Sequence, residues 1–448
     1  MKSCLVGWLL LGVTLVDCAL GDLDFELAWK VESKEGFSGP NEIRDMTTGK
    51  TRGIVVCDVG AGIVCFAADG ERLWEYALKP PVTAYPAVGD IDGDGTEEVV
   101  ACGGQGTVVV LDASGKLKWT AHTPGSVGAE SCPSIADLDG DGKSEILVGD
   151  LTGWLSCFDG TGRLRWAFRG KGEQMGPAVV ADIYDTPGKE ILVTSHDRHI
   201  YALSAQGAWL WDINRDDDLF PNSTPILADV DGDGILELYV GGGLHHFYRI
   251  DLRKPALVLE KNVLTHVNSA ICATDFDGDG KDEIVFGNKG GGVWCYGHEG
   301  FRWNREVTTI NLSMCPMAVD LDGDPDLEVL FLFNGIHAFD TDGSSLLEAS
   351  SPGIANSPPL VGDFDNDGRM EIIIAGHGMF GTSMVACLKW NVPYRRDSRA
   401  WTVFAGNRAH TGRVPGAEKC PPLPAILATD APSRAGFAPH GDVRLFTG

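Results

Sequence analysis

Acidic residues recur along this chain at a fixed spacing that suits a divalent cation. Six segments carry carboxylates at positions one, three, five and nine. These segments begin at Asp90, Asp137, Asp229, Asp275, Asp320 and Asp363. Calcium takes several hard oxygen ligands, and a tight turn lets alternate Asp side chains converge while a backbone carbonyl completes the set. One such segment would carry little weight, because Asp and Gly are ordinary turn residues. Six in one register predict calcium loops.

Each loop is expected to bind its ion through positions one, three, five, seven and nine, with position seven acting through its backbone carbonyl. The predicted ligands are Asp90, Asp92, Asp94, Thr96 and Glu98; Asp137, Asp139, Asp141, Lys143 and Glu145; Asp229, Asp231, Asp233, Ile235 and Glu237; Asp275, Asp277, Asp279, Lys281 and Glu283; Asp320, Asp322, Asp324, Asp326 and Glu328; and Asp363, Asp365, Asp367, Arg369 and Glu371. Position six is Gly in five loops and Pro325 in the sixth, whose turn geometry is therefore in question. We expect five or six calcium ions with a mainly structural role.

The spacing of the loops predicts the architecture. A worn copy from Asp182 keeps Asp182 and Glu190 but lacks the middle carboxylates, and a second worn copy starts at Asp45. Eight units therefore begin 43 to 47 residues apart. Periods of this length indicate a solenoid, an array or a propeller, and four short apolar segments per unit fit the strands of a propeller blade.

Tryptophan gives a second repeat signal. Trp74, Trp119, Trp166 and Trp211 each follow the start of their unit by 29 residues, and we expect the indoles to pack between blades. Residues 25–31 look like a fourth strand that precedes the first unit. They are predicted to complete the last blade and close the ring, which removes exposed sheet edges. The fold prediction is an all-β, eight-bladed β-propeller of four-stranded antiparallel blades.

The two ends of the chain differ from the repeats. Met1–Gly21 has Lys2, an apolar run and small residues near its end, as expected of a cleaved secretory signal peptide. Cys18 raises a lipoprotein anchor as the less favoured alternative, because Asp17 stands where such signals have a small residue. We therefore divide the chain into a signal peptide (1–21), the propeller (22–412) and a Pro/Ala-rich tail (413–448) that we expect to be disordered.

Composition limits the partners. A formal net charge of −27 argues against nucleic acid, and much of that charge lies in the acidic loops. Apart from the leader, no segment approaches the length of an apolar membrane span, so we expect a secreted or periplasmic monomer without a transmembrane segment. The cysteines recur at equivalent strand positions, which indicates small buried side chains, and Cys57–Cys65 is the one pair that we consider for a disulfide.

These motifs resemble known repeat families. The acidic loops and the strands after them resemble FG-GAP (VCBS-type) repeats, as in integrin α-subunit propellers. The segments LDASGKLKW and FDGTGRLRW resemble repeats of the quinoprotein (PQQ-like) propellers, and WTVFAGNRAHTG (401–412) resembles a segment that ends such exported propellers. The resemblance implies the fold and calcium binding but no activity. The chain lacks the adjacent Cys pair and the CxxCH haem motif of quinone-dependent dehydrogenases, so we do not expect PQQ.

Histidines gather in the predicted turns between the second and third strands. Those turns lie on the face opposite the acidic loops, because successive turns of an antiparallel sheet alternate between its two ends. The candidate ligand residues there are His196, Arg198, His199, His245, His246 and His377. One interpretation is that polar loops simply tolerate these residues. The other is that they line a pocket for a glycan or a transition metal, or perform acid–base chemistry.

Taken together, the sequence favours an exported calcium-binding propeller that acts as a binding or adhesion module rather than an enzyme. Its partner would be a glycan or a cell-surface or envelope protein. A carbohydrate-active enzyme resembling a polysaccharide lyase, using the His-rich face, is one alternative. A cell-envelope protein scaffold is another.

Overall fold

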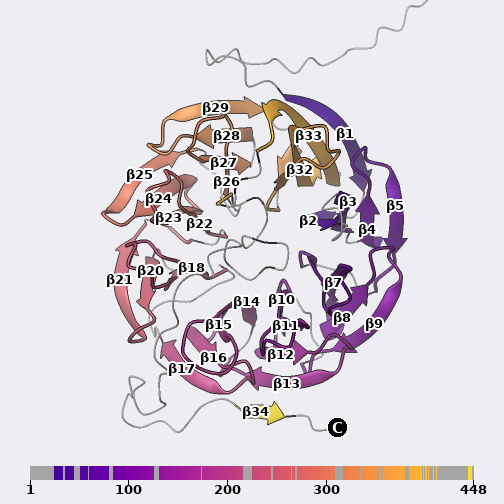
Figure 1. The fold of residues 1–448 in the computed structure, drawn as a ribbon, viewed down its shortest axis with the longest axis vertical. Coiled ribbons are helices and arrows are strands. Elements are labelled where there is room, and N and C mark those ends of the chain that lie inside the picture. Colours follow the sequence, from indigo (N-terminus) through magenta and orange to yellow (C-terminus); the bar gives the residue numbers. More distant parts are fainter. Residues whose placement is uncertain are drawn as a thin grey trace, which may run out of the picture.

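Eight antiparallel sheets are arranged around a ring in the computed structural model of the protein (Figure 1). The structure describes residues 25–400, 402, 407, 410 and 442–445, except for gaps at 34–35, 45–50, 59, 80–83, 126–130, 173, 215–223, 244–245, 264, 268–269, 308–315, 333–334, 351–352, 356, 379–382, 396 and 398. Within these ranges there is no α-helix, and hence none with the length and apolar character to cross a membrane. The predicted eight-bladed β-propeller is confirmed.

Blades 1 to 4 occupy the first half of the chain. Blade 1 consists of β2 (Phe37–Arg44), β3 (Thr51–Asp58), β4 (Gly62–Phe66) and β5 (Arg72–Tyr76). Blade 2 consists of β6 (Ala87–Gly89), β7 (Glu98–Gly103), β8 (Thr107–Leu111) and β9 (Leu117–His122), with the 3-10 turn η1 (Gly104–Gly106) between β7 and β8. Blade 3 consists of β10 (Ser134–Ala136), β11 (Glu145–Gly149), β12 (Trp154–Phe158) and β13 (Leu164–Arg169). Blade 4 consists of β14 (Met175–Ala181), β15 (Glu190–Ser195), β16 (His199–Leu203) and β17 (Trp209–Asn214).

Blades 5 to 8 repeat the pattern. Blade 5 consists of β18 (Ile226–Ala228), β19 (Glu237–Gly241), β20 (His246–Asp251) and β21 (Ala256–Asn262). Blade 6 consists of β22 (Cys272–Thr274), β23 (Glu283–Gly287), β24 (Gly292–Gly297) and β25 (Gly300–Glu306). Blade 7 consists of β26 (Met317–Val319), β27 (Glu328–Leu332), β28 (Gly335–Phe339) and β29 (Ser345–Ser350). Blade 8 contains β30 (Gly353–Ala355), β31 (Leu360–Gly362), β32 (Arg369–Gly378), β33 (Ser383–Pro393) and the N-terminal β1 (Phe25–Ser33).

Strand β1 closes the ring as the sequence predicts. It pairs antiparallel with β33, with Phe25 opposite Trp390 and Ser33 opposite Ser383. The rings of Phe25 and Trp390 stack with their centroids 5.8 Å apart. Figure 1 shows β1 lying along the outside of β33, so the first and last described strands of the propeller share one blade. Closure of this kind leaves no open end of the ring for further blades to join.

The middle strands of the blades form the core. Every residue of β7, β8, β11, β12, β15 and β16 is buried, as are those of β19, β23 and β27. A strand covered on both faces by neighbouring blades has no solvent side, so its sequence reads as a continuous apolar run. The runs after each acidic loop, such as EILVG in β11, follow this rule.

Tryptophans join each blade to the next, as predicted, and five of them do so with a hydrogen bond. Each indole Nε1 donates to a backbone carbonyl in the following unit, at 2.6 to 3.1 Å. These residues are Trp29, Trp74, Trp119, Trp166 and Trp303. The indole of Trp211 instead donates to the hydroxyl of Tyr184 within its own blade, at 3.0 Å. The repeated indole is therefore an inter-blade clamp in addition to a core residue.

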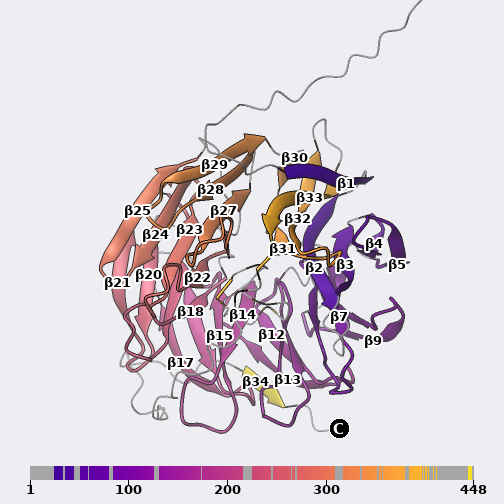
Figure 2. The same ribbon diagram turned by 45° about the horizontal axis from the view of Figure 1, so that its top comes forward.

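The C-terminal tail differs from our expectation over its four described residues. Strand β34 (Asp442–Leu445) pairs antiparallel with β13 and adds a fifth strand to blade 3 (Figure 1, Figure 2). The outer edge of a blade offers unpaired backbone groups, which a short segment lacking any strand signature of its own can still satisfy. The predicted signal peptide (1–21) and the worn loop after Asp45 lie outside the described residues. The eight described cysteines are buried, and Cys57 and Cys65 form no disulfide.

Candidate functional site

The acidic loops connect the first and second strands of their blades and therefore lie on one face of the ring. In five loops the position-one carboxylate closes the turn by accepting the backbone N–H of the position-six glycine, at 2.9 to 3.1 Å. Those glycines, for example Gly95 and Gly142, have φ values of 82° and 84°. Glycine adopts this left-handed conformation without a steric penalty, which explains the DxDGDG pattern.

The position-nine glutamate ties the end of the loop to its beginning. One carboxylate oxygen accepts the position-two backbone N–H, at 2.8 to 3.0 Å in the loops of Glu98, Glu145, Glu283 and Glu371. These four side chains are buried although they begin strands β7, β11, β23 and β32 or lie within them. The second oxygen is left to face the other carboxylates of the loop.

The carboxylates of each loop converge on a shared space. Ligand oxygens lie within 4.8 Å of one another in groups that include Asp90, Asp92 and Asp94 in blade 2 and Asp363, Asp365, Asp367 and Glu371 in blade 8. The loops that begin at Asp137, Asp229 and Asp275 contain similar groups. Several acidic clusters of this chain are therefore able to hold a metal ion.

Buried oxygens without partners support a cation in this space. Asp229, Asp275 and Asp363 each have a buried Oδ1 without a hydrogen-bond donor, and so has Glu237 at its Oε1. Leaving a buried carboxylate oxygen unsatisfied is costly, and a divalent cation bound to oxygen ligands would remove that cost. The donor set is all oxygen, which suits calcium or magnesium better than a soft metal.

Sequence reasoning missed a basic residue that reaches into most of these loops. In blade 2, Lys118 Nζ lies 2.6 Å from Asp92 and 2.9 Å from Glu98. In blade 3, Arg165 takes the same place, 2.9 Å from Asp139 and 2.5 Å from Glu145. A cation from the outer strand of the blade thus offsets part of the loop's charge.

Blades 5, 6 and 8 also place a basic side chain beside the carboxylates of their acidic loop. Arg302 contacts Asp277 and Glu283 at 2.9 and 2.8 Å, and Lys389 contacts three carboxylates of its loop, including Glu371 at 3.1 Å. In blade 5 the cations are Arg249 and Arg253, both on the strand-three side. The signal was present in the sequence, because Lys118, Arg165, Arg302 and Lys389 each directly precede the repeated Trp.

Burial shifts the glutamates of these loops toward the protonated form. Burial, with the loop aspartates adding to it, raises the pKa of Glu237 to about 7, despite the opposing effect of Arg249. Burial likewise raises the pKa of Glu283 to about 7, with Arg302 opposing it. A bound divalent cation would favour the ionised form of both groups, so cation binding would release protons near neutral pH.

Two loops depart from the pattern. In blade 4, Glu190 still accepts the backbone N–H groups of Ile183 and Tyr184, but the Thr186 hydroxyl donates to its second oxygen where other loops have a carboxylate cluster. Both carboxylate oxygens of Glu190 therefore have donors, which agrees with the interpretation of this segment as a worn copy of the acidic loop. In blade 7, Glu328 accepts the N–H of Leu321 as in the other loops, yet Pro325 has no N–H to offer Asp320.

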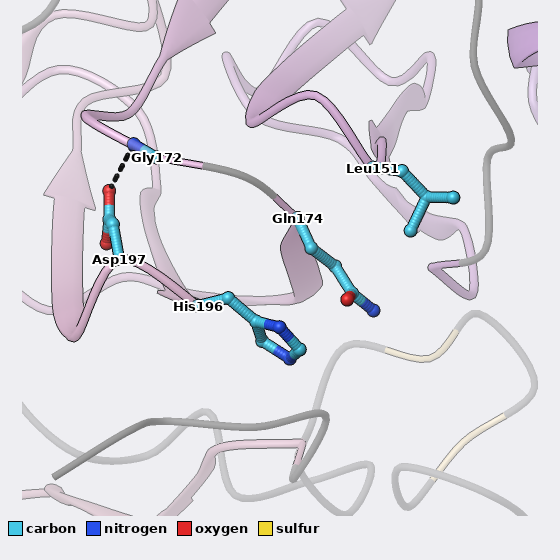
Figure 3. Close-up of a pocket in the computed structure, with 5 residues that line it drawn as sticks. All are labelled: Leu151, Gly172, Gln174, His196 and Asp197. Atoms are coloured by element: carbon cyan, nitrogen blue, oxygen red, sulfur yellow. Dashed lines mark hydrogen bonds between the residues drawn. The ribbon is translucent and has the colours of Figure 1, made fainter.

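On the opposite face a pocket of about 560 Å³ opens between blades 3 and 4. It is lined by Leu151, Gly172, Gln174, His196 and Asp197. Figure 3 shows the side chains of Leu151, Gln174 and His196 directed into the same space, while Asp197 turns toward the backbone N–H of Gly172. Gln174 adopts φ 53°, in the left-handed region that side-chain-bearing residues seldom enter. The volume falls within the range of small-molecule sites.

The walls of this pocket are fixed by a polar network in blade 4. Asp197 accepts hydrogen bonds from the N–H groups of Lys171 and Gly172 at 2.9 and 3.1 Å, and from the Tyr201 hydroxyl at 2.6 Å. His199 is buried beside it, with its Nδ1 2.7 Å from Asp212. Hydrogen bonds from His199 and Trp209, together with the charge of Lys171, hold the pKa of Asp212 below its usual value despite burial. Asp197 and His199 therefore support the pocket, and the His196 ring is free to meet a ligand.

The other predicted ligand residues have separate surroundings. The His246 Nδ1 lies 3.2 Å from the Tyr248 hydroxyl, and Arg198 is exposed with φ 73° in the turn before β16. His377 pairs through its backbone with Ile354 and Ser383 at the end of β32. His245 lies outside the described residues. The structure thus brings His196 to the pocket together with Leu151 and Gln174, two residues that the sequence analysis did not single out.

The sequence matches one described family. The FG-GAP-like repeat matches residues 80–148 and 275–331, which contain the acidic loops of blades 2, 3, 6 and 7. No curated protein gives a significant match to the chain.

Solved structures share the propeller architecture. BamB from Moraxella catarrhalis superposes with a TM-score of 0.58 at 14% identity, covering 84% of this chain and 99% of its own. Sqt1 from Saccharomyces cerevisiae gives a TM-score of 0.59 at 12% identity over 82% and 98% of the two chains. Quinohemoprotein alcohol dehydrogenase from Comamonas testosteroni gives 0.55 at 13% identity over 82% and 76%. At these identities the likeness concerns the fold alone. The chain is thus an eight-bladed β-propeller that carries FG-GAP-like repeats.

Proposed function

We propose that this chain is an exported, calcium-stabilised propeller that acts as a binding module, with a glycan as the ligand that its pocket fits best. The observation that carries the calcium part is the set of buried carboxylate oxygens without donors at Asp229, Asp275, Asp363 and Glu237. Calcium would be held by these loops on one face of the ring. The ligand would bind on the other face, so calcium supports the scaffold without touching the ligand.

The pocket between blades 3 and 4 has the chemistry of a sugar site. Gln174 and His196 offer groups that donate to and accept from hydroxyls, and Leu151 offers an apolar surface on which the face of a sugar ring can lie. Asp197 is occupied by the protein's own donors, so the pocket presents no uncompensated carboxylate to a ligand. This balance of polar and apolar groups favours a neutral glycan over a cation.

The test is retention on immobilised polysaccharides, with and without a chelator. Wild-type protein should be retained on one or more polymers, and His196→Ala should lose at least about tenfold in affinity, the cost of one or two hydrogen bonds in a desolvated site. His298→Ala is the matched control, because His298 is exposed on a turn of the calcium-loop face. Equal retention of both variants and the wild type would refute this pocket, and retention on no polymer would favour a protein-binding scaffold.

A second candidate, a carbohydrate-active enzyme, rests on the His199–Asp212 pair. An imidazole held by a carboxylate is a common proton acceptor. Its side chain is only 4% exposed, however, and it stacks on Tyr201, whose hydroxyl is directed to Asp197. Binding is therefore the favoured function. Incubation of the protein with a retained polymer separates the two, because an enzyme would release shorter chains and a binding module would return the polymer intact.

A further inference from the structure

Described residues of the segment that follows the last blade contact both the acidic loops and the inner strands of the ring. We call residues 394–410 the strap. Its first described part lies over blades 6 and 7, where the Thr274 hydroxyl donates to the Arg399 carbonyl at 2.6 Å. Arg399 in turn donates to the backbone carbonyls of Asp275 at 3.2 Å and Pro325 at 2.6 Å. The strap therefore contacts two acidic loops through their backbone.

The Asp320 loop of blade 7 is the unusual partner in this contact. Residues 306–368, which include the whole blade, contain no Lys or Arg. The blade thus lacks the outer-strand cation that Lys118 or Arg302 provides elsewhere. Five carboxylates nevertheless occupy the loop, at Asp320, Asp322, Asp324, Asp326 and Glu328.

Pro325 removes a second feature of the loop. In the other five loops the position-one Oδ2 accepts the N–H of the position-six glycine. Proline has no N–H, and its ring fixes φ near −65°, far from the positive φ of those glycines. The turn therefore keeps a single left-handed residue, Gly323 with φ 91°. The turn that gathers the ligands in the other loops is not reproduced here.

Arg395 of the strap lies beside the carboxylate oxygen that has lost its glycine donor. Its Nη1 lies 3.7 Å from Oδ2 of Asp320, the atom that glycine N–H groups satisfy elsewhere, and donates to the Gly323 carbonyl at 2.7 Å. Arg399 donates a hydrogen bond to the Pro325 carbonyl of the same turn. Asp320 is 9% exposed, so its carboxylate has little access to water. Arg395 thus brings a positive charge near Asp320, whereas Arg399, which is itself paired with Asp397 at 2.8 Å, adds a backbone hydrogen bond to the turn.

Beyond Arg399 the strap continues into the centre of the ring. The Thr402 carbonyl accepts the N–H of Val361, on the inner strand of blade 8. His410 is fully enclosed: its carbonyl accepts the Ser134 hydroxyl at 3.0 Å, and its ring nitrogens lie 3.2 Å from the Pro133 carbonyl and 3.4 Å from the Asn41 amide. The described residues of the strap therefore contact blades 6, 7 and 8 as well as blades 1 and 3.

We infer that the Asp320 loop is a docking site for the chain's own arginine-bearing strap and not a sixth calcium site. The inference rests on the proposed calcium binding of the other five loops. Loss of the glycine turn and gain of Arg395 and Arg399 convert a cation loop into an anchor. Arg395 and Arg399 anchor the described part of the strap to this turn.

Calcium stoichiometry tests the first half of the inference. Wild-type protein, stripped with chelator and titrated with calcium, should bind five ions by native mass spectrometry. The double variant Pro325→Gly with Arg395→Gln should bind six, because it restores the turn and vacates Asp320. Six ions on the wild type, or five on the double variant, would overturn the inference. Absence of any bound calcium would refute the proposed function instead, and the strap would then be judged by the second experiment.

Proteolysis tests the docking itself. Chymotrypsin has target residues in the strap at Tyr394 and Trp401, and neither is altered by Arg395→Gln with Arg399→Gln. This variant should be cut there at least about tenfold faster than the wild type, because release of the strap exposes it. Arg72→Gln with Arg163→Gln is the charge-matched control, since both arginines are exposed and belong to blades 1 and 3. Equal rates for the docking variant, its control and the wild type would overturn the docking.

Discussion

At the residue scale, a basic side chain and the proposed calcium ion would compete for the carboxylates of an acidic loop. A Lys or Arg on the third or fourth strand of the blade and the proposed calcium ion would draw on the same carboxylates, as Lys389 on β33 and the cluster of Asp365, Asp367 and Glu371 illustrate. The basic residue limits charge repulsion in the metal-free chain. A bound calcium ion would satisfy the oxygens that the basic residue leaves without donors. The basic residue would therefore allow each loop to form without calcium, and a bound calcium ion would stabilise the loop further.

Removal of Lys389 should separate these two effects. Lys389→Met should lower the melting temperature in chelator by several degrees, because three carboxylates lose their counter-charge. The same variant should bind calcium in this loop on the order of tenfold more tightly, since repulsion between two cations is gone. Thermal unfolding across a calcium titration measures both. Lys79→Met, an exposed control, should change neither; weaker calcium binding by Lys389→Met would contradict this role of Lys389.

The raised pKa values of two loop glutamates predict an unusual dependence of folding stability on pH. The folded-state pKa of Glu237 and of Glu283 is about 7, above the ordinary glutamate value of 4.5. The folded chain therefore binds more protons than the unfolded chain between these values. Its stability in chelator should be highest near pH 5 and should fall as the pH rises through about 7. Calorimetry in chelator at several pH values measures this slope, and stability that instead rises from pH 5 to 8 would contradict it.

Calcium binding to the loops of Glu237 and Glu283 should reverse this dependence of stability on pH. Binding requires the ionised carboxylates, so the calcium-induced gain in stability should grow between pH 5 and pH 8. The matched variant Glu237→Gln with Glu283→Gln removes both titrations. It should flatten the curve in chelator and reduce the response to calcium.

Among the elements, the repeat explains why short strands suffice. Each blade contributes strands of only three to eleven residues, and neighbouring blades bury both faces of the middle strands. The joints between blades depend on an indole, its carbonyl acceptor and a glycine that leaves room for the ring. At Gly115 an added Cβ would lie 2.5 Å from Trp74, and Gly70, Gly162 and Gly207 face Trp29, Trp119 and Trp166 in the same way.

Gly115→Ala should loosen the joint between blades 1 and 2. The residue has φ 81° and no room for a Cβ beside Trp74, so strain and overpacking combine. Gly95→Ala is the control, because Gly95 has φ 82° and open space around it. Measured in chelator, both should lose about 1–2 kcal/mol through the backbone, and Gly115→Ala should lose about 1–3 kcal/mol more through packing. Equal losses would show that the Trp74 contact does not constrain the joint.

The sequence predicts the elements better than it predicts their side-chain partners. Carboxylates at fixed spacing, Trp at a fixed offset and residues 25–31 before the first unit were enough for the blade count and for closure by β1. Periodicity cannot show which side chains meet across blades. For that reason Arg165 was not assigned to the Asp137 loop, and Leu151 and Gln174 were not assigned to the pocket of His196.

At the scale of the whole molecule, the two faces of the ring carry different candidate sites. One face carries the acidic loops and the docked strap, with Arg395 and Arg399 completing the one loop that lost its glycine turn. The other carries the pocket of His196 and the polar network of blade 4. The described residues of the strap contact the acidic loops through Arg395 and Arg399, and the inner strands through the buried His410. This division allows the ligand face to change without disturbing the loops that stabilise the scaffold.

Thermal unfolding with and without calcium tests the central claim most directly. Five sites with dissociation constants of about 10⁻⁴ M would together add about 7 kcal/mol to stability at about 1 mM calcium. The account predicts a melting temperature many degrees higher in millimolar calcium than in excess chelator, with magnesium far less effective because it demands stricter octahedral geometry. An unchanged melting temperature would show that the acidic loops do not bind calcium and would contradict the account.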